Sequence, residues 1–481
     1  GEETPGQEGE ETPVEEQPED STGTVDIRAD TNRNGTIDMG APTEDNGEDE
    51  WSVDSGAIFL ANIDDDMEQC PQWGTDLNLP KCNDAADEVI NGDLDLKDLA
   101  RMRTAPMPDV EEGTQATISV SNPGYNYVRL FINEGGEFKL FNFIDQKLTT
   151  QQIRDGVELA IEGKDVIRDA SAWNGRITLT YGVSDAQGNS LGLDILNMRM
   201  SPMMLYHHLL DAEVAYVASM NGAASEVFRS DFQAGIEAAG GATTYFPMMV
   251  SDQWNQDYFE TGYMSMPSAD GGQHAIRVNF RSANVDNPNS DTNPLRAAGQ
   301  VVFSYLRGID SAGIQEYDLS HPGQMDSLDS FGNTETIPPY SFNGESYPLG
   351  RIYRGSTPNF YPDQKFTKML EDQEIQPPVY VDTSWLLVGH VDETISFAPA
   401  DTELGWKLVM NDAVMAVDML QELYETGYGD TVMFEGKTWS QGVSAEVTIS
   451  QVLNDEDIMA ESYSSAAEVN EQVAIIQAAT G

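Results

Sequence analysis

The pattern of apolar residues changes near Met198, and this change constrains the fold more than any other feature of the sequence. From Val25 to about Asn197, short apolar runs such as Ala116–Val120 and Ile177–Tyr181 alternate with polar residues, and glycine, asparagine and aspartate separate the runs. A period of two is typical of strands that bury one face. This part of the chain is therefore predicted to be an immunoglobulin-like β-sandwich with long loops.

In the remainder of the chain, strand-like and helical patterns alternate. Glu213–Ala218 is predicted to be a strand, Ala223–Ala239 a helix, and Thr243–Val250 a second strand. Later helices are predicted over Met410–Thr426 and Asn470–Ala479. Alternation of this kind indicates an α/β domain.

The first residues have a different composition from both domains. Residues 1–24 consist largely of Glu, Pro, Thr and Gly, with almost no large apolar side chains, so burial cannot offset the entropy lost on ordering. We therefore expect three parts: a disordered acidic tether over residues 1–24, a sandwich over residues 25–197 and an α/β domain over residues 198–481.

The chain is strongly acidic, with 82 Asp and Glu residues against 25 Lys and Arg residues and a formal charge of −57. This excess argues against nucleic acids and anionic membrane surfaces as partners, because both require a basic face. It favours cations as ligands and a calcium-rich or saline extracellular setting. No apolar run reaches the roughly 18 residues of a membrane span, so none is expected.

The two cysteines, Cys70 and Cys82, enclose the short loop Pro71–Lys81. They could form a disulfide in an oxidising compartment or remain as two structural thiols. The sequence leaves both possibilities open.

The segment Trp385–Phe397 is predicted to be an apolar strand that carries polar chemistry. Residues two apart in a strand project to the same side, so His390 and Asp392 are expected to point together. Val388 and Val391 would supply apolar surroundings. A proton donor beside a cation-binding carboxylate would supply one part of an active site.

Two further segments complete the pattern. In Asp252–Tyr263, Asp257 could pair with Asp392 on the two ends of a guanidinium, and Ser327–Pro339 is followed by Tyr347–Ile352. Together with the histidine segment, in this order and at this spacing, they resemble the catalytic domain of the calcium-dependent protein-arginine deiminases. Three long motifs in register are far more specific than any single short one.

The resemblance extends from about Val25 to Gly481 and implies a fold and an activity. The family's catalytic domain is a five-bladed, pseudo-symmetric propeller of the pentein fold, which hydrolyses peptidyl-arginine to peptidyl-citrulline and ammonia. This chain is expected to stop before the last blade, which carries the nucleophilic cysteine in the family. The expected fold is thus a β-sandwich followed by an incomplete α/β propeller.

The resemblance also assigns roles to individual residues. Asp257 and Asp392 would hold the substrate guanidinium, whose planar fork of donors matches carboxylates. His390 would protonate the departing ammonia and then activate the hydrolytic water. Trp254 would stack on the substrate, and Arg281 matches a substrate-side arginine. The other histidines match no family motif and are expected to be structural or surface groups: His207, His208, His274 and His321.

No cysteine follows Cys82, so the chain alone is expected to lack the thiolate that covalent catalysis requires. We expect it to be inactive unless a separate C-terminal segment of the same precursor supplies one. One alternative is a non-catalytic calcium-binding surface or scaffold protein that holds arginine peptides on the same fold. A small-molecule guanidine hydrolase is a further alternative. An extracellular or cell-surface location is favoured, and a cytoplasmic one, as in animal relatives, is the alternative.

Calcium is the expected cofactor, because it takes about six to eight oxygen ligands and acidic loops supply them. The loop Asp30–Asp38 begins like an EF-hand, but its twelfth position is Ala41, so a true EF-hand is not expected. The resemblance instead implies a calcium cluster in the sandwich, with one ligand from the catalytic domain; solvated acidic loops are the alternative. Its members are Asp30, Asn32, Asn34, Asp38, Asn62, Asp64, Asp66, Asp84, Asp87, Asp95, Asp98 and Asp310.

A second calcium position is implied within the catalytic domain. Gln256 adjoins Asp257, so an ion there would fix the backbone that aims the catalytic carboxylate and would act as a switch. A further family site beside it is not expected, because Tyr258 stands where an acidic residue is required. The implied ligands are Gln256, Glu260, the carbonyls of Phe331 and Thr334, and Glu335.

Overall fold

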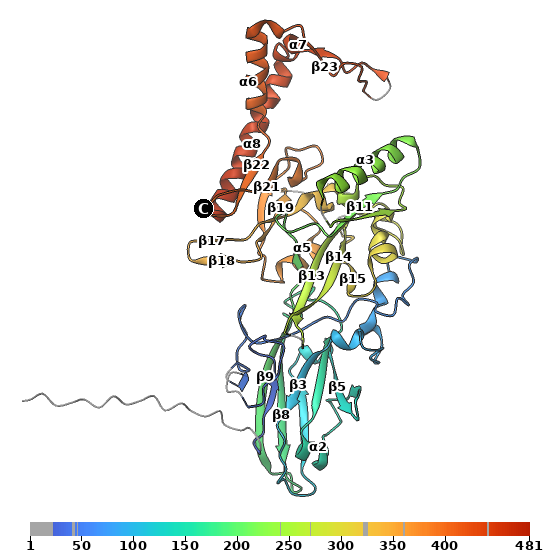
Figure 1. Cartoon of the computed structure of the whole chain (residues 1–481), viewed down its shortest axis with the longest axis vertical. Coiled ribbons are helices and arrows are strands. Elements are labelled where there is room, and N and C mark those ends of the chain that lie inside the picture. The colour runs from blue at the N-terminus through green and yellow to red at the C-terminus, as the bar shows by residue number, and fades with distance from the viewer. Residues whose placement is uncertain are drawn as a thin grey trace, which may run out of the picture.

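The computed structural model describes residues 23–40, 44–45, 47–240, 242–269, 271–320, 326–358, 361–439 and 442–481. Most of the expected acidic tether, together with His321, lies outside these residues. The described chain mixes helices with strands, and the strands form several small sheets rather than one large sheet (Figure 1). Among the described residues, no sheet closes into a barrel.

Two sheets enclose one core in residues 27–200, which we call the two-sheet region. The expected alternation is visible in β4 and β8, where buried residues alternate with more exposed ones along each strand. All pairings are antiparallel except that of β2 with β9, which is parallel. The first sheet has the order β1 (Ile27–Ala29), β3 (Ala100–Thr104), β7 (Glu158–Gly163), β5 (Val128–Glu134) and β6 (Glu137–Phe141), and the second has β2 (Ala57–Phe59), β9 (Ser190–Met200), β8 (Arg176–Ser184) and β4 (Gln115–Val120).

The remaining strands form smaller sheets, which with their helices make up the C-terminal region, residues 204–481. A four-stranded sheet contains β10 (Met204–Leu205), β13 (Phe259–Pro267), β14 (Gln273–Arg281) and β15 (Ser311–Gln315), and a three-stranded sheet contains β16 (Thr334–Ile337), β19 (Arg351–Ser356) and β20 (Val379–Asp382). The two-stranded pairs are β11 (Val214–Ala218) with β12 (Thr244–Met248), β17 (Tyr340–Phe342) with β18 (Glu345–Tyr347), β21 (Ile395–Pro399) with β22 (Trp406–Met410), and β23 (Val432–Met433) with β24 (Val447–Thr448).

The helices differ widely in length, and several short 3₁₀ turns carry predicted site residues. The α-helices are α2 (Thr150–Asp155), α3 (Ala223–Ala239), α4 (Asn255–Tyr258), α5 (Gln364–Glu371), α6 (Ala413–Leu423), α7 (Ile449–Leu453) and α8 (Glu456–Thr480). The 3₁₀ turns that concern the site are η1 (Leu79–Lys81), η2 (Asp84–Ala86), η3 (Asp95–Lys97), η8 (Phe331–Asn333) and η9 (Val391–Glu393).

The expected helix α3 is confirmed and ends at Gly240, whose φ of 70° is in the left-handed region that suits a glycine at a helix end. The helix expected from Met410 begins later, as α6, and continues as a π-helical turn, η10 (Tyr424–Tyr428). The helix predicted near the end of the chain is the last part of the much longer α8. Figure 1 shows α6, α7 and β23 projecting away from the sheets.

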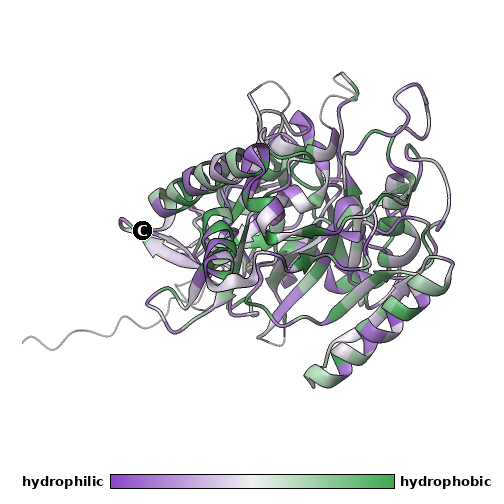
Figure 2. Ribbon diagram, turned by 90° about the horizontal axis from the view of Figure 1, so that it is seen from above, coloured by the Kyte–Doolittle hydropathy of each residue, from purple (hydrophilic) through white to green (hydrophobic). Residues whose placement is uncertain are grey.

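One apolar core runs through both regions. It includes Leu130 and Leu179 of the two-sheet region and Ile276, Phe280 and Phe366 of the C-terminal region. The apolar residues lie mainly on the inner strands, while the outer loops are hydrophilic (Figure 2). Burial of this shared apolar surface holds the regions together. No helix in the described parts of the chain combines the length and the apolar character needed to cross a membrane.

Candidate functional site

Carboxylates meet where the two regions touch, and two of the three named next are buried. Oxygens of Asp64, Asp66 and Asp310 lie within 4.8 Å of one another. Asp64 is completely buried, and neither of its carboxylate oxygens has a hydrogen-bond partner among the described residues. A buried charge without a partner costs on the order of several kcal/mol, so an ionised Asp64 requires a compensating cation. The carboxylates therefore form a site suited to a hard cation.

The pKa values of these carboxyl groups reflect the crowding. Burial, and then the negative charges of neighbouring aspartates, raise the pKa of Asp64 well above its usual range. Burial raises the pKa of Asp98 to about 9, with Asp66 and Asp310 adding to the effect. Burial likewise raises the pKa of Asp84 to about 7. Without a bound cation, several of these groups are expected to carry a proton at neutral pH.

His274 belongs to the same cluster, although no sequence motif predicted it there. Its Nε2 lies 2.5 Å from Asp98 Oδ1 and 3.8 Å from Asp310 Oδ1. Burial lowers the pKa of His274. Asp98 and His274 are 176 residues apart, so no local pattern could have revealed the contact.

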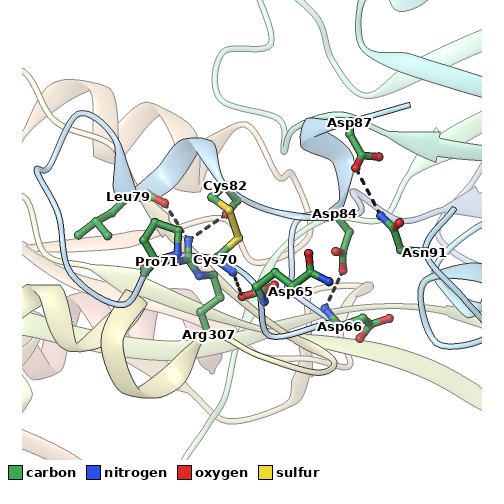
Figure 3. The surroundings of a disulfide bond; sticks show 11 residues. Asp65, Asp66, Cys70, Pro71, Leu79, Cys82, Asp84, Asp87, Asn91 and Arg307 are labelled. Carbon is green, nitrogen blue, oxygen red and sulfur yellow. Dashed lines mark hydrogen bonds between the residues drawn. A yellow bond between two sulfur atoms is a disulfide. The ribbon is translucent and has the colours of Figure 1, made fainter. Parts of the chain in front are cut away.

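Of the other predicted ligands, Asn62 and Asp84 bond to acidic residues of this group, whereas Asp87 lies outside it. Asn62 donates to Asp95 at 2.7 Å and to Glu162 at 2.8 Å. Asp84 accepts a hydrogen bond from the Asp66 backbone at 2.8 Å. Asp87 is exposed and bonds the nearby Asn91 side chain at 3.4 Å, outside the buried group (Figure 3).

The loop Asp30–Asp38 is folded by its own side chains. Asp30 accepts from the backbone of Asn34 and Gly35 at 2.9 and 2.8 Å. Asn32 donates to Glu44 at 2.8 Å. The structure brings neither these residues nor Asp38 into the groups of converging carboxylates found among the described residues. Their role as calcium ligands stays a prediction.

Cys70 and Cys82 form a disulfide, which decides between the two possibilities left open by the sequence (Figure 3). The closed loop is attached to the C-terminal region by Arg307, which donates to three of its carbonyls, those of Pro71, Leu79 and Cys82, at 2.7 to 2.9 Å. The loop is thus fixed to both regions and lies beside the carboxylate cluster.

The disulfide loop also delivers Asp76 to Arg281. The two side chains are completely buried and form an ion pair of 2.7 Å. Arg281 Nη1 also donates to the side chain of Gln315 at 3.0 Å. Because the guanidinium is fully enclosed, a contact between Arg281 and a substrate would require this pair to open, and the expected substrate role stays a prediction.

The expected strand over Trp385–Phe397 is wrong. Gly389 has a φ of 80°, which an L side chain rarely adopts, and the chain then turns through η9, so only β21 is extended. Leu387 is 97% exposed and Val388 is also exposed, so of the two valines only Val391 supplies apolar surroundings.

His390 and Asp392 nevertheless converge, because η8 lies against η9. A Cβ placed on Gly332 would lie 2.6 Å from His390 Nδ1 and 2.9 Å from Asp392 Oδ2, so both groups point at the same small space. His390 Nε2 lies 2.8 Å from the Ser327 carbonyl. A carbonyl only accepts, so Nε2 is the donor and Nδ1 faces the shared space.

Burial raises the pKa of Asp392 to about 6, and the charge of His390 opposes this shift. The negative charges of Glu335, Glu393 and Asp257 add to the rise. Asp392 is therefore largely ionised at neutral pH and able to pair with a cation.

Asp257 lies on α4, immediately before β13, and α4 packs against η8. Its Oδ2 lies 2.9 Å from Arg296 Nη1, and Arg296 also pairs with both oxygens of Asp252, at 2.8 and 2.9 Å. Trp254 is 60% exposed at the start of this helix and is free to stack on another molecule. Asp252 and Asp257 thus already bind a guanidinium, that of Arg296.

The residues predicted as the second calcium position also gather. Gln256 donates to Glu260 at 2.8 Å, and burial raises the pKa of Glu260 to about 7, with the charge of Glu335 adding to the rise. Phe331 and Thr334 lie at the adjoining η8 and β16. His208, which sequence reasoning missed, lies 2.7 Å from Glu335. The hydrogen bond that His208 donates to Glu335 raises the pKa of His208.

Comparison with known proteins identifies related sequences. The family described as "Protein-arginine deiminase (PAD)" matches residues 191–481. The rat protein-arginine deiminase type-4 is 28% identical over 436 residues, which cover 86% of this chain and 60% of the rat protein. The human type-4 enzyme is 34% identical over 195 residues, covering 39% of this chain and 26% of its own length. The chain thus spans about 60% of the rat relative.

Solved structures give weaker matches. A C. jejuni agmatine deiminase is 15% identical, covers 47% of this chain and 70% of its own, and has a TM-score of 0.22. A mutant of the SrpA adhesin from Streptococcus sanguinis is 14% identical, covers 37% of this chain and 84% of its own, and has a TM-score of 0.17. These scores support no argument about fold or function.

Proposed function

The chain belongs to the protein-arginine deiminase family, since the family match spans more than half of its length, and on this premise we propose that it takes part in calcium-dependent deimination of peptidyl-arginine. It supplies the guanidinium-binding and calcium-binding parts of the enzyme. The observation that carries the proposal is the convergence of His390 and Asp392 on the space beside Gly332, within the field of Asp257.

Asp257 and Asp392 hold the substrate guanidinium. Two carboxylates match the planar fork of donors and orient the central carbon toward a nucleophile. Support comes from Arg296, whose guanidinium is already bound by Asp257, and from the pKa of Asp392 near 6, which leaves it ionised at neutral pH. Trp254 packs against the substrate chain, a role that its exposed position allows.

His390 transfers protons through Nδ1. Because Nε2 donates to the Ser327 carbonyl, the ring is held in one orientation, and Nδ1 is the nitrogen that faces the shared space. When protonated, Nδ1 gives its proton to the departing ammonia. When neutral, it accepts a proton from the water that releases citrulline.

The covalent step requires a thiolate. Its sulfur bonds to the guanidinium carbon, ammonia leaves with the proton from His390, and water then breaks the carbon–sulfur bond to give citrulline and the thiol. Both cysteines of this chain are joined in a disulfide, so neither supplies the thiolate. We assign it to a separate C-terminal segment and propose that this chain is inactive alone.

Calcium is the proposed cofactor at two places. The buried, unpartnered oxygens of Asp64 fit a hard cation, which would neutralise the repulsion among the carboxylates around it. In the C-terminal region, Gln256, Glu260 and Glu335 would hold a second ion together with the carbonyls of Phe331 and Thr334. Because α4 carries both Gln256 and Asp257, fixing this helix would orient the substrate carboxylate.

The proposed domain assignment follows the family. Residues 25–197 would form an immunoglobulin-like sandwich, which the two-sheet core supports, and residues 198–481 an incomplete pentein propeller. The disulfide favours an oxidising compartment and hence an extracellular or cell-surface location over the cytoplasm. Proteins or peptides that contain arginine are the proposed substrates.

A second candidate function is a calcium-binding scaffold that holds arginine peptides without modifying them. The observation that favours it is the absence of a free cysteine, since both are bridged. The two functions predict the same binding and differ in the chemistry that follows.

The test is to mix the purified chain with calcium and an acetylated, amidated Gly-Arg-Gly peptide, and to measure both binding and peptide mass. We expect binding that requires calcium, with no conversion to citrulline. Conversion by the pure chain would overturn the assignment of the thiolate, and calcium-independent binding would overturn the proposed role of calcium. Citrulline formed after adding the C-terminal segment would exclude the scaffold function.

A further inference from the structure

The guanidinium of Arg296 is bound by two carboxylates. Its three nitrogens donate only to the carboxylates of Asp252 and Asp257, at 2.8 to 2.9 Å. Arg307, by contrast, donates to three backbone carbonyls, and Arg281 is completely enclosed. The side chain of Arg296 is 22% exposed. Its guanidinium also lies 5.8 Å from the centre of the Tyr258 ring, so it is held mainly by charge and stays partly open to solvent.

The backbone of Arg296 is held much more firmly than its side chain. The carbonyl of Arg296 accepts from Arg281 Nη2 at 3.1 Å, and its amide donates to Asn284 at 2.9 Å. The preceding residue, Leu295, donates to Asp76 at 3.1 Å. The disulfide loop thus fixes the position from which the Arg296 side chain reaches Asp257, while the guanidinium itself remains replaceable.

We propose that Arg296 is an internal competitor for Asp257, from which an arginine substrate must displace it. The inference rests on the proposed function, in which Asp257 holds the substrate guanidinium. An internal ligand of this kind lowers the apparent affinity for substrate by the fraction of molecules whose site is free. It also keeps Asp252 and Asp257 paired with a positive charge when no substrate is present.

Displacement is favourable only for a group with matching chemistry. A substrate guanidinium can replace the hydrogen bond and the positive charge that Arg296 supplies to Asp257. A lysine ammonium offers a point charge without the planar fork. Arg296 therefore raises the selectivity for arginine as well as reducing affinity. Once displaced from Asp257, its guanidinium can keep its two bonds to Asp252.

The test measures binding of the acetylated, amidated Gly-Arg-Gly peptide by calorimetry, with calcium present. Arg296→Gln is expected to bind the peptide at least tenfold more tightly than the unchanged chain. Arg296→Lys should bind with an intermediate affinity. The matched control is Arg154→Gln, which also removes an arginine paired with a carboxylate, Glu112, but in the two-sheet region; its affinity should be unchanged.

The outcomes separate this inference from the proposed function. If Asp257→Asn weakens binding and Arg296→Gln fails to strengthen it, Arg296 does not compete for Asp257, and this inference is overturned while the proposed function stands. If Asp257→Asn leaves the affinity unchanged, the proposed role of Asp257 fails as well. Should Arg296→Gln not fold, because it leaves two carboxylates unpaired, Arg296→Lys decides: unchanged or weaker binding overturns the inference.

Discussion

Asp76 Oδ1 lies 2.7 Å from Arg281 Nη1, and both side chains are completely buried. The pair joins a loop of the two-sheet region to β14 of the C-terminal region. Asp76 also accepts from Gln300 at 3.0 Å and from the Leu295 amide. An enclosed guanidinium without its carboxylate would be an uncompensated buried charge. This ion pair therefore makes the two regions depend on each other for stability.

Asp76→Asn should lower the free energy of unfolding by about 3 kcal/mol, because it removes one charge of a buried pair. Urea unfolding followed by tryptophan fluorescence measures the change. Asp155→Asn is the matched control, since Asp155 is an exposed carboxylate bonded by Gln151, and its effect should stay within about 0.5 kcal/mol. Equal stability of the two variants would show that the buried pair contributes nothing.

The stability of the calcium-free chain should fall as the pH rises from about 4 to about 9. Carboxyl groups whose pKa values are raised on folding, such as Asp84 (about 7), Asp98 (about 9) and Glu48 (about 9), bind more protons in the folded state than in the unfolded state. Their contribution is greatest at low pH and is lost as the pH passes the folded pKa.

Thermal unfolding in a chelator at several pH values measures how the melting temperature depends on pH. Added calcium should reverse the contribution of the carboxylate cluster to this dependence, because a cation then replaces the protons. Asp64→Asn should weaken the calcium effect. A melting temperature that rises with pH in the chelator would contradict the account.

Gly332→Ala should weaken binding of the arginine peptide at least tenfold while the chain stays folded. A Cβ at this position meets His390 Nδ1 at 2.6 Å and Asp392 Oδ2 at 2.9 Å, so both side chains must move. Calorimetry gives the affinity and thermal unfolding gives the stability. Gly235→Ala is the control, because Gly235 lies within α3 with open space around it, and alanine there should be neutral or stabilising. Unchanged binding by Gly332→Ala would show that the shared space is not the site.

Replacing both Cys70 and Cys82 by serine should lower the free energy of unfolding by about 2 to 4 kcal/mol, the usual range for a loop of this size. Reducing agent should lower the stability of the unchanged chain by a similar amount and leave the double variant unaffected. If reductant has no effect on the unchanged chain, the bridge does not stabilise the loop that carries Asp76.

Some of this structure could be predicted from the sequence. The period-two runs Ala116–Val120 and Ile177–Tyr181 predicted β4 and part of β8. The family resemblance of the Asp257 and His390 segments led us to expect that they meet. The expected strand at His390 failed because period two does not reveal a glycine at positive φ, and here Gly389 bends the chain.

The contacts of Arg281, Arg296 and His274 could not be predicted, because each depends on a partner brought close only by the tertiary fold. Arg281 and Asp76 are 205 residues apart, and Arg296 and Asp257 are 39 residues apart. Residue type alone did not show that Arg281 is buried and paired with Asp76.

The most direct test of the central claim is calcium-dependent binding of the Gly-Arg-Gly peptide, compared with the same peptide carrying citrulline in place of arginine. The account predicts that the arginine peptide binds in calcium but not in chelator, that the citrulline peptide binds far more weakly, and that Asp392→Asn loses at least tenfold in affinity for the arginine peptide. Equal binding of both peptides, or binding that Asp392→Asn leaves intact, would contradict the assignment of a guanidinium site to Asp257 and Asp392.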